Sequence, residues 1–285
     1  MTFANTIIQG ILLGGLYALY AAGLSLIFGV MRLVNLAHGD FIVLGAYFLL
    51  SLTLTFGMPP QYAMLVAMPF MFAIGWALQR VVLNRTLKND LLVPLLVTFG
   101  LQIIIQNALL QFYSADSRRL SVGAFETTSV NIAGINIGWM PLLTLIMAVV
   151  VISVLSYLFY NTSLGRKLRA TSDSTVYVQI MGVNPHKIFA IAMGIAFVVM
   201  TVAAFFMGVR SNFDPSVGPA RLLYAFEAVV IGGLGSLWGT LAGGVILGVS
   251  QAIGGTIHPE WQVLAGHLVF LVIILVRPRG LFPKQ

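Results

Sequence analysis

The stretch TIIQGILLGGLYALYAAGLSLIFGV, residues 6–30, contains no charged residue and is long enough to cross a bilayer as one helix. No basic residue precedes it and it is too long for the core of a signal peptide, so we expect an uncleaved first membrane helix. The rest of the chain has the same character. Of its 285 residues, 59% are hydrophobic and only 8% are charged, and the mean hydropathy is +0.98. Such a composition excludes a soluble enzyme or a disordered chain and predicts an all-α polytopic membrane protein.

Further charge-poor stretches of spanning length predict the remaining helices, at 41–56 (extended back to about Leu33), 62–83, 91–112, 139–160, 188–209 and 261–276. The uncharged run 228–259 contains nine glycines. Two short crossings that turn near 232–236 would accommodate it, and so would a re-entrant hairpin. We therefore expect a single transmembrane domain over residues 1–285, with eight or nine transmembrane helices, some of them short or re-entrant.

The basic residues predict the orientation, because cytoplasmic loops carry an excess of Lys and Arg. One set of alternate loops contains Arg32, Arg80, Arg85, Lys88, Arg166, Lys167, Arg169, Lys187, Arg277, Arg279 and Lys284, and the other contains Arg118, Arg119, Arg210 and Arg221. The first set should be cytoplasmic, with the amino terminus outside and the carboxyl terminus inside. A cytoplasmic loop at 161–187 and an external loop at 113–138 follow. The net charge of +7 then suits anionic lipid headgroups rather than nucleic acid.

The long cytoplasmic loop contains a short amphipathic helix. Val176, Tyr177, Ile180 and Met181 fall on one narrow apolar face, Ser172 or Asp173 can cap its start, and Gly182 can end it. Such a helix can dock into a groove on another protein or lie on the lipid surface, and the residues favour neither.

Polar residues inside the predicted helices are candidates for a solute path. Thr98, Gln102 and Gln106 fall on one helix face, where they either join helices or line a path. Gly235, Gly239 and Gly243 are spaced by four residues, which favours close helix packing, and exposed glycine backbone as a path wall is the alternative.

The segment Asn35-Leu36-Ala37-His38-Gly39-Asp40 opens the second predicted helix. Asp40 is expected to cap that helix or to pair with Arg32, and His38 is weak evidence for proton coupling or metal binding. Glu227 is expected to face a water-filled cavity or a base on another helix. No phosphate-binding loop, zinc-protease motif or nucleophile elbow occurs, so the sequence predicts neither a catalytic residue nor a metal site. Cysteine is absent.

Several motifs resemble those of the branched-chain amino acid ABC permeases. They are Gly14-Gly15-Leu16-Tyr17-Ala18-Leu19, the segment from Asn35 to Asp40, Gly45-Ala46-Tyr47, Gly165-Arg166, Gly182-Val183-Asn184, the segment from Val230 to Ser236, and Arg277-Pro278-Arg279-Gly280-Leu281-Phe282. The resemblance covers essentially the whole chain and implies the membrane subunit of a bacterial ABC importer, with the permease fold of that class, in the inner membrane.

The resemblance also implies partners. They are a second permease subunit, sister or identical, two ATPase subunits that bind ATP and magnesium, and a periplasmic substrate-binding protein, with no cofactor in this chain itself. The residues implied in coupling to the ATPase are Arg166, Lys167, Arg169, Asp173, Val176, Tyr177, Ile180, Met181 and Gly182. Permeases often carry Glu-Ala-Ala about six residues before the loop glycine, but here Val176-Tyr177-Val178 stands there, so docking should use apolar contacts.

The implied function is a translocation path for branched-chain or other neutral amino acids or similar small solutes. Its candidate residues are Asn35, His38, Thr98, Gln102, Gln106, Glu227, Gly232, Gly233 and Gly235. Urea, short amides and aromatic acids are alternative solutes. An ATP-independent channel or secondary transporter is a further alternative, because Arg32, His38, Asp40 and Glu227 could titrate inside the membrane.

Overall fold

The computed structural model describes residues 3–86, 92–126, 128–132 and 135–282, and Lys88 and Lys284 of the predicted cytoplasmic set lie outside them. Within these ranges, seven helices are long and apolar enough to cross a membrane. These spanning helices are α1 (Phe3–Met31), α2 (His38–Phe56), α3 (Pro60–Val81), α4 (Leu92–Tyr113), α5 (Trp139–Asn161), α8 (Pro185–Arg210) and α10 (Leu237–Ile257). Two further helices of the bundle are shorter, α9 (Gly218–Gly232) and the apolar α11 (Trp261–Val276). The chain is thus an all-α polytopic membrane protein, as predicted.

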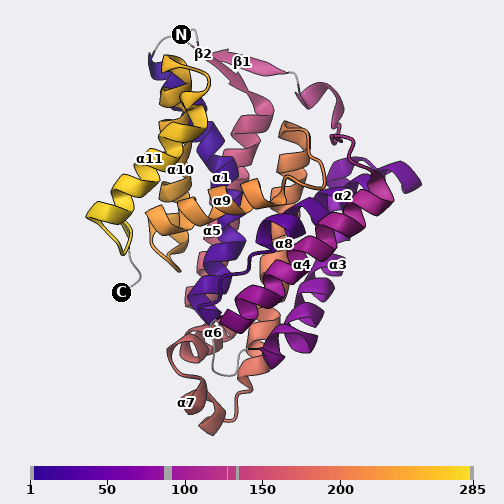
Figure 1. Ribbon diagram of the computed structural model, residues 1–285, viewed down its shortest axis with the longest axis vertical. Helices are drawn as coiled ribbons and strands as arrows, with labels where there is room; N and C mark the ends of the chain where they lie inside the picture. Colours follow the sequence, from indigo (N-terminus) through magenta and orange to yellow (C-terminus); the bar gives the residue numbers. More distant parts are fainter. Residues whose placement is uncertain (1–2, 87–91, 127, 133–134, 283–285) are drawn as a thin grey trace.

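Short elements occupy the two ends of the helix bundle. A 3-10 helix η1 (Leu83–Arg85) follows α3, and a second, η2 (Gly123–Glu126), precedes the antiparallel hairpin of β1 (Ser129–Ile132) and β2 (Ile135–Gly138). The loop at 161–187 forms α6 (Ser163–Asp173) and α7 (Thr175–Ile180). Figure 1 shows the hairpin and the amino terminus at one end of the molecule and α6 and α7 at the opposite end.

The core of the bundle is built on α1 and α8, whose side chains are mostly buried. Helix α1 packs along α10 and helix α3 packs along α8. The first contact depends on glycine: a Cβ built on Gly14 would lie 2.5 Å from the Val245 Cα, and one on Gly248 would lie 2.4 Å from the Gly10 carbonyl oxygen. Small residues therefore bring these two backbones together, as in other membrane helix pairs.

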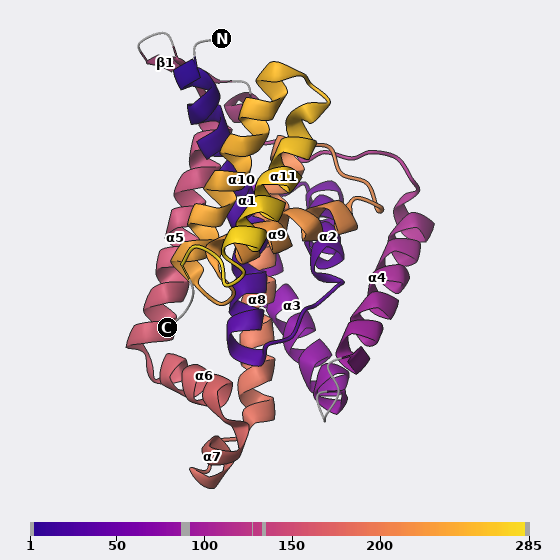
Figure 2. The ribbon, with the colours of Figure 1, turned by 60° about the vertical axis from the view of Figure 1, so that its left-hand side comes forward.

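The two halves of the chain follow the same plan in opposite directions. In each half a long helix (α1 or α8) is followed by a non-helical segment, then by a helix that starts inside the bundle (α2 or α9) and two further helices. Helix α1 starts at the hairpin end, whereas α8 starts directly after α7 at the other end (Figure 1). The contacts of α1 with α10 and of α3 with α8 correspond under this inversion. The halves differ at their last helix, because α11 packs along α10 whereas α4 stands away from the bundle and contacts mainly α2 (Figure 2).

Two boundaries differ from the sequence prediction. The second helix starts at His38 rather than near Leu33, because the Asn35 side chain accepts a hydrogen bond from the Ala37 N–H and the Leu36 N–H donates to Thr98 Oγ1. These bonds satisfy the backbone without a helix. Arg221 was expected in an external loop, but it lies in the first turn of α9, with its guanidinium 5.9 Å from the centre of the Tyr20 ring.

The glycine-rich run forms the end of α9 and the whole of α10, joined by a tight turn at the predicted position near 232–236. Gly233 and Gly235 adopt φ values of 105° and 81° in this turn. The chain end then caps α9, because the Leu281 and Phe282 N–H groups donate to the Ile231 and Gly232 carbonyls. The closing motif of the sequence thereby satisfies carbonyl groups that the end of a helix leaves without partners.

Candidate functional site

A helix break in the first half places the start of α2 inside the bundle. After α1 ends, residues 32–37 run back along it, and His38, the first residue of α2, lies beside the middle of α1. There the His38 Nε2 lies 2.8 Å from the Tyr20 carbonyl oxygen. The other ring nitrogen, Nδ1, has no partner within the described ranges, and no group of three metal-ligating side chains occurs there either.

A second break brings the start of α9 to the same place. Residues 211–217 separate α8 from α9, and Gly218, the first residue of α9, lies against Gly39 and Asp40 of α2. A Cβ on Gly39 would lie 1.9 Å from the Gly218 carbonyl oxygen, so neither backbone leaves room for a side chain at this contact. The amino-terminal ends of two helices, each carrying partial positive charge, therefore meet inside the bundle.

A buried carboxylate occupies this junction. Asp40 is 1% exposed, and its Oδ1 accepts a hydrogen bond of 2.7 Å from Gln106 Nε2 on α4. Its Oδ2 has no hydrogen-bond partner in the part of the chain that the structure describes. The expected pair of Asp40 with Arg32 does not form: Arg32 is exposed, and no ion pair of the described residues includes Asp40. Asp40 makes no side-chain capping bond to α2 either.

An apolar groove lies between α2 and α4. Its volume is about 610 Å³, and Ser51 and Tyr113 in its wall are joined by a hydrogen bond. Asp40 and Gln106 do not line the groove themselves, but Asp40 lies one helical turn before Leu44 and Gln106 follows Ile105, and both of these line it. The groove is lined by Leu44, Ser51, Leu54, Thr55, Ile104, Ile105, Ala108, Leu109, Phe112 and Tyr113.

Four of the predicted path residues gather at this junction. Asn35, His38 and Thr98 are fully buried there, and Gln106 is half-buried. Thr98 and Gln106 share the predicted face of α4 and contact the start of α2, whereas Gln102 between them is half-buried and makes no hydrogen bond with a described residue. Asp40 was missed as a path candidate, although an acidic residue at the start of an apolar helix was the available signal.

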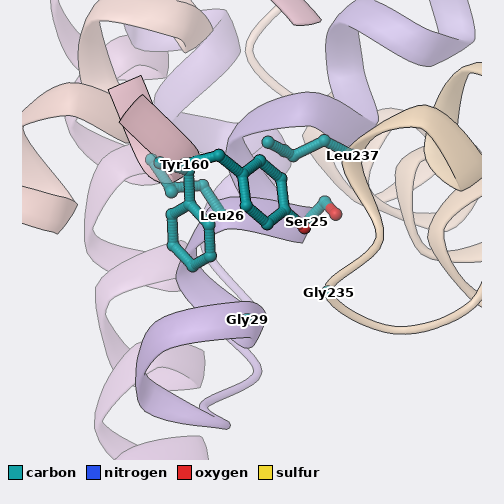
Figure 3. A pocket seen from close by; sticks show the side chains of 7 residues that line it. Ser25, Leu26, Gly29, Tyr160, Gly235 and Leu237 are labelled. Atoms are coloured by element: carbon teal, nitrogen blue, oxygen red, sulfur yellow. The ribbon is translucent and has the colours of Figure 1, made fainter. Parts of the chain in front are cut away.

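The other path candidates lie elsewhere. Gly232 packs on α10, where its Cβ would lie 2.1 Å from the Gly239 carbonyl oxygen, and Gly233 lies against Gly280 of the chain end. Gly235 faces Gly29 of α1 across a crevice of about 10 Å³, room for about one water molecule (Figure 3). These three glycines thus serve close packing at the α6 end of the bundle, away from the junction.

Glu227 forms a second buried polar site. It is 1% exposed, and its Oε1 is hydrogen-bonded to the His267 Nδ1 of α11. Its Oε2 has no partner among the described residues. The sequence predicted a cavity or a base on another helix, and the structure supplies the second of these. The pair joins α9 to α11.

The short amphipathic helix forms, with one correction to its start. The cap is Ser174, whose hydroxyl accepts a hydrogen bond from the Tyr177 N–H. Ser172 and Asp173 do not cap α7, because they form the last turn of α6. The Ser172 hydroxyl instead donates to the Gly29 carbonyl. At the other end Gly182, with a φ of 78°, ends the helix.

This helix carries an exposed apolar face at the end of the molecule. Val176, Tyr177, Ile180 and Met181 are between 63% and 78% exposed, whereas Val178 faces inward. Asp173, Arg166 and Lys167 on α6 are exposed as well. Arg169 differs from them, because its guanidinium donates to the Phe159 carbonyl and lies over the Tyr160 ring.

The segment between α4 and α5 is held by polar contacts. The Arg118 backbone pairs with Phe213, and the Arg119 guanidinium forms an ion pair of 3.3 Å with Glu126. Burial would raise the pKa of the Glu126 carboxyl, but hydrogen bonds from the Val122 N–H and its neighbours, together with Arg119, outweigh burial and lower it. Glu126 therefore stays ionised at neutral pH.

The comparison with known proteins is consistent with these features. A sequence model of the family described as "Branched-chain amino acid transport system / permease component" matches residues 6–277. The high-affinity branched-chain amino acid transport system permease protein BraD of Pseudomonas aeruginosa is 26% identical over 99% of this chain and 96% of its own length. The permease protein LivH of Escherichia coli is 25% identical over 99% of this chain and 96% of its own length. The permease protein LivM of the same organism is 25% identical over 94% of this chain and 68% of its own length. No solved structure matches the chain significantly.

Proposed function

The chain belongs to the branched-chain amino acid transport system permease family, and from that premise we propose that it is the membrane subunit of a bacterial ABC importer for branched-chain or other neutral amino acids. The observation that carries the proposal is the family match over residues 6–277, which includes every helix that could span a membrane except the first three residues of α1. The chain is a transport subunit and not an enzyme, and ATP with magnesium would bind to separate ATPase subunits.

The α2–α4 groove supports a path along this chain. Its walls are mostly aliphatic, and the polar pair of Asp40 and Gln106 lies one turn before Leu44 and beside Ile105 of these walls, which suits a solute with an apolar side chain and a charged backbone. Helix α4, which forms one wall of the groove, stands away from the rest of the bundle (Figure 2). A second permease subunit packed there would complete the path.

A sister subunit is the better candidate for that second permease. LivH and LivM of Escherichia coli are both named as permease proteins of a high-affinity branched-chain amino acid transport system, and both are similar to this chain. A pair of related but different chains would therefore form the transmembrane part. The multi-pass pair would lie in the bacterial inner membrane, where a periplasmic protein delivers the solute.

The apolar face of α7 supports coupling to an ATPase. Four large apolar side chains on one turn and a half of helix would be costly in water and suit a groove on a partner. The exposed Arg166 and Lys167 nearby would meet acidic residues of that partner. Closure of the ATPase pair on ATP would then move α6 and α7, and through the Ser172–Gly29 contact the end of α1.

This motion would act at the two non-helical segments that precede α2 and α9. Residues 32–37 and 211–217 are non-helical and lie where α2 and α9 begin. Broken helices that meet inside the membrane are used for solute binding and gating in transporters with inverted repeats. Rocking of one half against the other would alternately open the junction to each side.

The test is reconstitution of the chain with a sister permease, two ATPases and the binding protein in liposomes. Binding protein loaded with leucine should stimulate ATP hydrolysis, and omission of this chain should abolish both the stimulation and leucine uptake. If uptake and stimulated hydrolysis proceed equally without this chain, the proposal fails.

A further inference from the structure

Asp40 is a buried carboxylate with one oxygen that accepts no hydrogen bond from a described residue. Asp40 is 1% exposed, no basic side chain of the described residues pairs with it, and its Oδ2 lacks any hydrogen bond there. An ionisable residue inside the membrane is expensive and usually marks a solute pathway. The hydrogen bond from Gln106 does not explain the acid, because an asparagine oxygen would accept it equally well.

A cationic partner would offset the cost of burying a charge at Asp40. The starts of α2 and α9 meet at this side chain, and a Cβ on Gly218 would lie 2.2 Å from the Asp40 Oδ1. Two helix amino-termini stabilise a negative charge at this position. A carboxylate held in that way has one oxygen ready to accept a strong hydrogen bond from an ammonium group.

The groove beside Asp40 fits the rest of an aliphatic amino acid. Leu44 of its wall lies one turn from Asp40, and Ile105 is the neighbour of Gln106. The groove, at about 610 Å³, is large enough for a small solute. The buried Asn35 Nδ2 at the same junction lacks a partner among the described residues, and it can donate to a solute carboxylate.

We propose that Asp40 binds the α-ammonium group of an aliphatic amino acid passing between α2 and α4, and that the Gln106 amide holds this place when no solute is present. The inference rests on the proposed transport function. On solute entry the ammonium donates to both Asp40 oxygens and the Gln106 amide moves away. The released amide and Asn35 then face the solute carboxylate, while the aliphatic side chain lies on the groove wall.

A purely structural role of Asp40 makes a different prediction. If Asp40 only fastens α4 to the helix junction, Asp40→Asn keeps the shape and the bond from Gln106 and should transport normally. If Asp40 binds the ammonium, Asp40→Asn removes the charge and should lower leucine uptake by about tenfold or more, because charge-assisted hydrogen bonds are the strong ones. The complex should still assemble and hydrolyse ATP without solute at the wild-type rate.

A second variant tests the site without removing a buried group. Gln106→Lys places an ammonium against Asp40 and should block leucine uptake while raising the melting temperature of the complex. Asn107→Lys, also on α4 but exposed and bonded only to the Ile103 carbonyl of its own helix, is the matched control and should retain uptake.

A binding experiment tests the contribution of the ammonium group separately from that of the rest of the solute. The purified complex without binding protein is titrated with leucine and with 4-methylpentanoate, which has the same carbon chain and carboxylate but no ammonium. Wild type should prefer leucine, and Asp40→Asn should lose this preference. Wild-type uptake by Asp40→Asn or by Gln106→Lys would overturn the inference while leaving the transport proposal intact, whereas failure of the wild-type complex to take up leucine would refute the transport proposal itself.

Discussion

Gly39 of α2 and Gly218 of α9 touch backbone to backbone, and a Cβ on Gly39 would lie 1.9 Å from the Gly218 carbonyl oxygen. This contact joins the two halves of the chain where α2 and α9 begin, in addition to the packing of α1 on α10 and of α3 on α8. It also fixes the carboxylate of Asp40, the next residue after Gly39, at the starts of both helices. The position of the candidate site therefore depends on two residues that have no side chain.

Gly39→Ala should destabilise the protein strongly, because the obstructing atoms are backbone and cannot move aside. Overpacking of this kind costs about 1–3 kcal/mol, which should lower the melting temperature in detergent by several degrees. Gly100→Ala on α4 is the control, since nothing lies within 4 Å of its added Cβ. That variant should be neutral or slightly more stable. Equal melting temperatures for the two variants would contradict the contact.

Gly248→Ala should separate α1 from α10. Its Cβ would lie 2.4 Å from the Gly10 carbonyl oxygen, also a backbone atom. The expected result is a lower melting temperature and a smaller yield of monodisperse protein. Gly255→Ala on the same helix meets only the Gln262 side chain at 3.5 Å, an ordinary contact, and should behave as wild type. If Gly248→Ala melts no lower than Gly255→Ala, the close approach of α1 and α10 is wrong.

His267→Leu should leave the Glu227 carboxylate buried without its partner on α11. Loss of one member of a fully buried pair costs about 3–5 kcal/mol. Because the His267 side chain is 34% exposed, the melting temperature should fall, but by less than for a fully buried pair. The double variant Glu227→Leu/His267→Leu removes both polar groups and should recover most of the loss. Thermal denaturation of the four proteins of this cycle measures the coupling, and strictly additive effects would show that the two residues do not interact.

Tyr177→Ser combined with Met181→Ser should uncouple the permease from its ATPase, because these are two of the four exposed apolar side chains of α7. We expect leucine uptake to fall by about tenfold or more, with less ATPase retained on co-purification and an unchanged melting temperature for the permease alone. Gln179→Ser, exposed on the same short helix, is the control. Full uptake by the double variant would exclude α7 as the docking element.

The positions of most helices could be predicted from the sequence, because apolar runs of bilayer length have few other outcomes. The starts of α2 and α9 could not. In the first case Asn35 and Thr98 satisfy backbone groups that would otherwise extend the helix, and Thr98 is 62 positions away from the Leu36 N–H that it bonds. In the second case Arg221 looks like a loop residue by charge alone, but its guanidinium lies over the Tyr20 ring of α1.

Only part of the candidate site could be predicted, because residue spacing defines a helix face but not its distant partners. The spacing of Thr98 and Gln106 defines one helix face, and the structure brings that face to Asn35 and His38. The role of Asp40 depends on which distant residue it meets, Gln106 rather than Arg32, and one-dimensional spacing does not contain that information. Glycine spacing indicates close packing but does not identify the partner helix. The sequence therefore could not distinguish a packing role of Gly232 and Gly235 from a role in the wall of a path.

Leucine uptake into liposomes that hold this chain, its sister permease and the ATPases tests the central claim most directly. With ATP available to the ATPases and loaded binding protein outside, the account predicts accumulation of leucine against its gradient. Without ATP, or with an ATPase that cannot hydrolyse ATP, it predicts no accumulation. Leucine flux of similar rate through this chain alone, with neither ATPase nor ATP, would contradict the account.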